Sequence, residues 1–113
     1  IPAGGVLVDC NHSVEAITAM LNAADLSALA PDTPFYLVSG VQPPELAGEE
    51  ENTVINALIN DASHIFLEVQ KYLRAIGFTH TIPLYEECGA RDSIVAATER
   101  TRPTLVLSLI SAS

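Results

Sequence analysis

Short runs of aliphatic and aromatic residues alternate along this chain with longer segments in which apolar residues recur every three or four positions. The short runs predict strands, and a continuous run such as Val6-Leu7-Val8 suits a sheet covered on both faces. The longer segments predict amphipathic helices. The predicted strands are residues 6–10, 35–38, 78–85 and 104–110, and the predicted helices are residues 13–29, 50–76 and 90–101. The alternation predicts an α/β fold, in which helices cover both faces of a parallel sheet.

The chain length sets the domain organisation. Its 113 residues suffice for one compact domain, residues 1–113, with a single core. Hydrophobic residues make up 49%, which argues against disorder. No apolar run approaches the roughly 20 residues of a membrane span, so we expect no direct membrane insertion. The net charge of -9 argues against a nucleic-acid partner, because phosphates need a basic surface.

The two cysteines point to a reducing compartment. Cys10 and Cys88 lie far apart, form no CxxC pair and fit no zinc spacing, so no metal site is predicted. A cytoplasmic location is the simpler inference. The acidic neighbours Asp9, Glu86 and Glu87 oppose thiolate formation, which argues against redox sensing.

Two of the predicted strands are expected at the edges of the sheet. Pro83 suggests an edge position for the third strand, where a missing N–H donor costs little. Leu105-Val106-Leu107 in the fourth strand is apolar and carries no charge that would oppose pairing. We therefore expect a homodimer, or pairing with a partner chain, through this exposed fourth-strand edge.

The turn after the first strand holds the candidate site. Ser13 is a good helix N-cap, and in open α/β sheets ligands bind at the mouth of such a turn. Asp9, Asn11, His12 and Ser13 gather there. The alternative is that Asn11 and Ser13 only shape the turn and cap the helix, and the residues alone leave both interpretations open.

No catalytic motif accompanies this turn. The sequence holds no GxGxxG, no GxxxxGK[ST] and no GxSxG, so a dinucleotide fold, a P-loop and an α/β-hydrolase elbow are not predicted. We assign no catalytic residue and expect a protein that is not an enzyme.

The order and spacing of several short segments resemble the universal stress protein family over almost the whole chain. Residues 6–13 resemble the family's opening strand, which ends in a Val-Asp-Gly-Ser turn before a helix. Residues 73–82, with Gly77, are similar to its long second helix, which runs through a glycine into the third strand. Other likenesses are Phe35 to Val41 with Pro43-Pro44, Gly89 followed by Ile94, and Thr104-Leu105-Val106-Leu107.

The resemblance implies a fold and a ligand site. The fold would be three-layered and like that of the adenine nucleotide alpha-hydrolases, with a four-stranded parallel sheet in the order 3-2-1-4. Adenosine would lie at the carboxyl ends of the first and second strands, where Asn11 and Ser13 would meet the ribose or phosphate and Val38 and Ser39 would border the base. The candidate cofactor-binding residues, with ATP or AMP as the ligand, are Asp9, Asn11, His12, Ser13, Val38, Ser39, Gly89 and Ser108.

The chain departs from the family pattern at two places. Asn11 and His12 stand where the nucleotide-binding branch has Asp and Gly. Residues 108–113 contain no glycine, whereas that branch holds the phosphates with a Gly-x-x-Gly run. The usual last helix and strand are also missing from this sequence, so we expect a degenerate or truncated member.

The expected function follows from the resemblance and these departures. We expect a non-catalytic regulatory or stress-response domain with weak or no adenine-nucleotide binding, in the cytoplasm or as the cytosolic domain of a larger protein. One alternative is a regulatory or assembly module of such a larger protein, for example a transporter. Another is a small nucleotide-hydrolysing α/β enzyme, which would need phosphate-holding glycines and a catalytic group.

Overall fold

The computed structural model describes residues 4–42 and 49–109. The predicted loop at residues 43–48 and the segment from Ile110 to Ser113 lie outside these ranges. The elements, in chain order, are β1 (Val6–Asp9), α1 (Val14–Ala23), β2 (Phe35–Gly40), α2 (Glu49–Ala75), β3 (Thr81–Glu86), α3 (Ala90–Thr101) and β4 (Leu105–Leu107).

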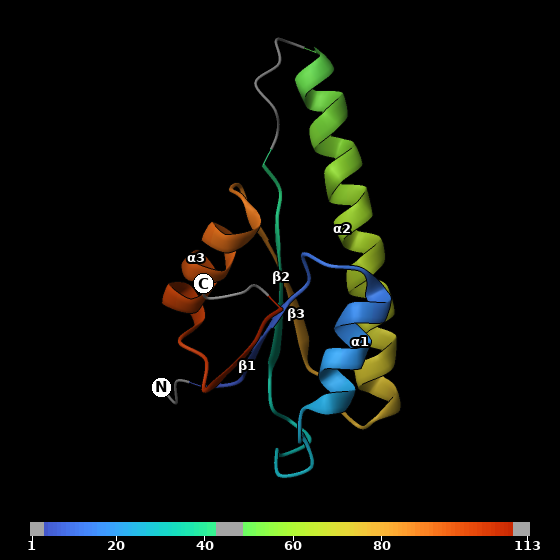
Figure 1. The fold of residues 1–113 in the computed structure, drawn as a ribbon, viewed down its shortest axis with the longest axis vertical. Helices are drawn as coiled ribbons and strands as arrows, with labels where there is room; N and C mark the ends of the chain where they lie inside the picture. The colour runs from blue at the N-terminus through green and yellow to red at the C-terminus, as the bar shows by residue number, and fades with distance from the viewer. Residues whose placement is uncertain (1–3, 43–48, 110–113) are drawn as a thin grey trace.

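The strands form one parallel sheet in the order β3-β2-β1-β4, which confirms the predicted order. In register, Val6 of β1 lies between Phe35 of β2 and Leu105 of β4. Figure 1 shows α1 and α2 on one face of the sheet and α3 on the other. The fold is therefore the predicted three-layer α/β/α arrangement, and the carboxyl ends of all the strands lie at one end of the sheet.

Two hydrophobic clusters hold the layers together. The larger one joins the sheet to α1 and α2, and includes the fully buried Phe35, Leu37, Ile17 and Leu73. Phe35 also packs against Phe78, with ring centroids 4.8 Å apart. The smaller cluster joins Leu7 and Val38 of the sheet to Ala97 of α3. The side chains of successive residues in β1 and β2 thus point to opposite faces of the sheet, as the pleat of a strand requires.

The helix α2 ends in a Schellman motif around Gly77. The N–H of Phe78 donates to the carbonyl of Leu73 at 2.8 Å, and the N–H of Gly77 donates to that of Arg74 at 3.1 Å. Gly77 has φ 104, a conformation that a glycine adopts without strain. Phe78 belongs to this cap, which explains why β3 begins at Thr81 and not at residue 78 as predicted.

The helix α1 ends earlier than predicted, at Ala23 instead of residue 29. Beyond it Ala24 is extended, and Asp25 folds the chain into a side-chain turn. Asp25 Oδ1 accepts hydrogen bonds from the Ser27 N–H at 3.2 Å and from the Ser27 hydroxyl at 2.6 Å. Such a turn competes with the helix for the same backbone groups. These bonds also hold the pKa of Asp25 below its ordinary value.

The backbone of each edge strand presents different groups to the outside. Phe35 donates to His80 and Val41 to Glu86, so the even-numbered peptide groups of β3 face β2. Pro83 therefore sits on the outer side, where its missing N–H breaks no pairing, and its predicted edge position is confirmed. On the opposite edge Leu105 donates to Gly5 of the segment before β1, so the N–H and C=O of Val106 point outward.

The long helix gives the molecule its shape. At 27 residues α2 is about 40 Å long, and one end extends past the strands (Figure 1). The molecule measures 48 × 31 × 26 Å along its principal axes. Within residues 4–42 and 49–109, no helix combines the length and the apolar character needed to cross a bilayer.

Candidate functional site

The site is built around the carboxylate of Asp9, at the carboxyl end of β1. Asp9 is completely buried. Its Oδ1 accepts hydrogen bonds from the backbone N–H of Asn11 at 3.0 Å and from Asn11 Nδ2 at 2.6 Å. Its Oδ2 lies 2.9 Å from His12 Nε2 and 2.9 Å from the Ser108 hydroxyl. Both carboxylate oxygens are therefore satisfied inside the fold, as a buried charge requires.

Asn11 extends this network to two further elements. Its Nδ2 donates to Ser93 Oγ of α3 at 3.2 Å, and its Oδ1 accepts the N–H of Gly40 at the end of β2 at 2.7 Å. Ser93 is also completely buried and donates to the carbonyl of Ala90 at 2.6 Å. One asparagine thus links the ends of β1, β2 and α3, and both of its N–H donors are occupied.

Asp9, His12 and Ser108 are the residue types of a hydrolase triad, but they are connected differently. The Ser108 hydroxyl donates to the carboxylate, whereas a nucleophilic serine gives its proton to a histidine base. An ionised carboxylate only accepts hydrogen bonds, so the contact of His12 with such a carboxylate requires a hydrogen on Nε2, and His12 is then the hydrogen-bond donor. The arrangement is suited to holding elements together.

An open cavity of about 450 Å³ lies beside this network, between the strand ends and α2. Its size is in the range of small-molecule sites. The residues that line it are Cys10, Asn11, His12, Ser13, Ser39, Gly40, Leu58, Asp61, Ala62 and Ile65. Its charged wall residue is the acidic Asp61, and no Lys or Arg is among the described residues that line it.

The structure brings most of the predicted site residues together. Asp9, Asn11, His12 and Ser108 share the hydrogen-bond network. Ser39 lines the cavity, and so does Ser13, whose hydroxyl caps α1 by accepting the Ala16 N–H at 3.2 Å.

Val38 and Gly89 take other places. The side chain of Val38 is buried in the cluster under α3, while its carbonyl accepts the Cys10 N–H at 2.8 Å. Gly89 precedes α3, where its carbonyl accepts the Ser93 N–H at 2.9 Å. Neither residue lines the cavity.

Sequence reasoning missed Ser93, Gly40 and the α2 side of the cavity. A serine in the first turn of the helix after β3 lies at the carboxyl edge of a parallel sheet, and this signal was available for Ser93. Asp61 had no comparable signal, because one carboxylate on a long polar helix face is ordinary.

The two cysteines are both free thiols. Cys10 is buried, and burial followed by the nearby Asp9 charge raises the pKa of its thiol far above the ordinary value. Partial desolvation and the charges of Glu86 and Asp92 also raise the pKa of Cys88. Both thiols therefore stay protonated at neutral pH.

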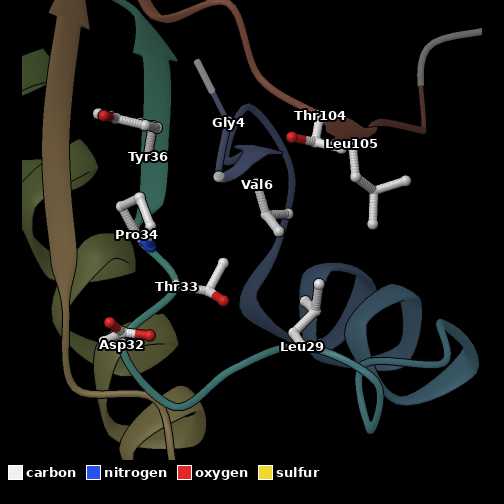
Figure 2. Close-up of a pocket in the computed structure, with 10 residues that line it drawn as sticks. Gly4, Val6, Leu29, Asp32, Thr33, Pro34, Tyr36, Thr104 and Leu105 are labelled. Carbon is white, nitrogen blue, oxygen red and sulfur yellow. The ribbon is translucent and has the colours of Figure 1, made fainter. Parts of the chain in front are cut away.

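A second cavity, of about 430 Å³, lies at the opposite end of the sheet. Figure 2 shows Pro34 and Tyr36 on one side of it and Thr104 and Leu105 on the other. Its carboxylate, that of Asp32, is exposed. Because ligands of open α/β sheets bind at the carboxyl ends of the strands, the cavity beside Asp9 is the stronger candidate.

No group of three or more His, Cys, Asp or Glu side chains in the described part of the chain is arranged to hold a metal ion. Comparison with protein-family models gave no match, and neither curated proteins nor solved structures matched the chain.

Proposed function

We propose that this chain is a non-catalytic regulatory domain of the universal-stress-protein type, with weak or no adenine-nucleotide binding. The proposal rests on the sequence resemblance, and the sheet order β3-β2-β1-β4 agrees with it. The cavity at the carboxyl ends of β1 and β2 lies where the resemblance puts adenosine.

The expectation of weak nucleotide binding rests on the hydrogen bonds that Asn11 already makes inside the protein. This residue corresponds to the family position that contacts the ribose. Here its two N–H donors serve Asp9 and Ser93, and its carbonyl oxygen accepts from Gly40. A ribose oxygen that accepted from Nδ2 would have to replace one of these two N–H bonds, and losing the bond to the buried Asp9 carboxylate would cost about 1.5–3 kcal/mol.

The charge distribution around the cavity also disfavours nucleotide binding. A triphosphate entering it would meet Asp61 and find no Lys or Arg among the described lining residues. The start of α1 offers backbone N–H groups to an anion, but the N–H of Ala16 is already taken by Ser13. The whole chain carries a net charge of -9, which repels a nucleotide further.

Calorimetric titration of the chain with Mg-ATP, AMP and adenosine tests this proposal. We expect dissociation constants weaker than about 100 μM for the nucleotides, because both N–H donors of Asn11 are already used and no Lys or Arg is among the described residues that line the cavity. Micromolar or tighter binding of ATP would contradict the proposal. A hydrolysis assay with Asn11→Ala as the comparison excludes the enzyme alternative if both proteins leave ATP intact.

A second candidate function, as an assembly module, is favoured by the edge formed by β4. Leu105 and Val106 are 37% and 40% exposed, and the outward peptide group of Val106 is positioned to pair with another strand. We propose that a second copy or a partner chain docks there, and that the protein works in the cytoplasm, where both of its thiols would stay reduced.

A further inference from the structure

We infer that Asp9 couples the cavity to β4 through a single oxygen atom. Oδ2 of Asp9 is shared by His12 Nε2 and the Ser108 hydroxyl, each 2.9 Å away. His12 lines the cavity, and Ser108 directly follows β4. The inference rests on the proposed regulatory function for what occupies the cavity, whereas the coupling is a property of the chain without any ligand.

A hydrogen bond to this shared oxygen is one anchor of the carboxyl end of β4. β4 is three residues long and pairs with β1. The side chains of Leu105 and Val106 are exposed, and Leu107 alone packs against the larger core cluster. The hydrogen bond from Ser108 joins positions 99 residues apart, so it fixes the end of this short strand to the centre of the sheet.

His12 is the partner of Asp9 that a ligand can reach. Its side chain is 26% exposed, whereas Asp9 is fully buried. A ligand oxygen that accepts a hydrogen bond from His12 Nε2 would draw the imidazole away from Asp9. The buried carboxylate then lacks one of its compensating donors, which is costly. Without this donor the carboxylate is held less firmly in its present orientation, and we expect its hydrogen bond from Ser108 to weaken.

Ligand binding in the cavity is thereby coupled to the stability of the pairing between β4 and β1. The ligand would be a molecule whose carbonyl, carboxylate or phosphate oxygen accepts a hydrogen bond from His12. Because thermodynamic coupling is reciprocal, a chain that pairs with β4 and holds Ser108 in place also strengthens the Asp9–His12 contact and lowers the affinity of the cavity for that ligand.

Amide hydrogen exchange followed by NMR tests the coupling without a ligand. The readout is the protection of the Leu107 amide, which faces β1, divided by that of Val69, which is buried in α2 and reports global opening. We expect Ser108→Ala to lower this ratio about tenfold and His12→Ala about fivefold, since each removes a bond to a buried charge. In the double variant we expect no loss beyond that of Ser108→Ala, because both act through the same oxygen.

Two further variants separate the coupling from general damage. His12→Gln keeps an N–H donor near the position of Nε2 and is expected to retain the ratio within about twofold. Ser13→Ala removes the cap of α1 without touching Asp9 and is expected to leave the ratio unchanged. The inference is overturned if His12→Ala leaves the ratio unchanged, if its effect adds fully to that of Ser108→Ala, or if Ser13→Ala lowers the ratio as much as His12→Ala. Failure of nucleotides to bind has no bearing on these results.

Discussion

At the scale of single residues, the identity of Asn11 follows from its neighbour. Asn11 Nδ2 lies 2.6 Å from Asp9 Oδ1, and Asp9 is completely buried. An aspartate at position 11 would bring two carboxylates to this distance, and like charges so close disfavour ionisation of both. Because the buried Asp9 carboxylate accepts hydrogen bonds from position 11, an amide side chain suits this position and a carboxylate does not.

We accordingly predict that Asn11→Asp, the residue of the nucleotide-binding branch, destabilises this chain. The cost at pH 7 is about 2–4 kcal/mol, because it removes two donors and adds an unpaired charge. We expect the neighbouring Asp9 charge to raise the pKa of the carboxyl introduced at position 11 above its unfolded value. The variant is therefore least impaired below about pH 4 and loses stability as the pH rises through the raised pKa.

Urea denaturation of both proteins at pH 4 and pH 7 measures this difference. Asn56→Asp, at an exposed position of α2, is the matched control and should change stability by less than about 0.5 kcal/mol. Equal effects of the two substitutions at pH 7 would argue against a strained carboxylate pair.

At the scale of elements, the end of β2 and the start of α3 meet without room for a side chain. A Cβ added to Gly40 would lie 2.6 Å from the carbonyl oxygen of Cys88 and 2.9 Å from that of Gly89. A Cβ added to Gly89 would lie 3.1 Å from the end of the Gln42 side chain. The first obstruction is backbone, whereas the second is a flexible group that can move.

Gly40→Ala should therefore destabilise the protein by about 1–3 kcal/mol, because the turn before α3 has to shift. Gly89→Ala is the control and should cost less than about 1 kcal/mol, mainly through a poorer N-cap. Chemical denaturation gives both values. A larger loss for Gly89→Ala would mean that this close approach does not limit the packing of α3 on the sheet.

At the same scale, local signals predicted where the elements lie better than where they end. Gly77 marked the end of α2 correctly, because a glycine after an amphipathic helix has one dominant use. The Asp25–Ser27 turn was missed, since alanines continue a helical pattern through it. The sequence pattern predicts Ile94, Val95 and Ala97 as the buried residues of α3, but Val95 is 54% exposed. The prediction for Val95 was wrong because the fully buried residues of α3 are Ser93 and Ala97, which form a narrow face.

At the scale of the whole molecule, the order of the elements determined the architecture. The alternation of four strands with helices predicted a parallel sheet with right-handed crossovers. The order 3-2-1-4 was an expectation from the family resemblance, and the structure has this order. The network around Asp9 was not accessible from the sequence, because it joins Ser108, Ser93 and Gly40 across three elements. No local pattern reports which polar side chains converge once the strands are aligned.

The open β4 edge predicts concentration-dependent self-association. Light scattering from micromolar to millimolar chain should show a rising mean mass for the native protein, because an exposed apolar edge favours pairing. Val106→Lys should keep the protein monomeric, since a charge at the edge opposes pairing. Val95→Lys, on the exposed face of α3, should associate like the native chain. A native protein that is monomeric throughout would count against the assembly function.

The unequal edges also decide how far such association can proceed. Pro83 occupies the middle one of the three outward positions of β3, where it removes an N–H donor, whereas Val106, the outward residue of β4, keeps both its N–H and its C=O available. If copies associate through β4, we expect the proline-bearing β3 edge to add further copies less readily. Association of this kind would favour a closed pair over fibrous polymers.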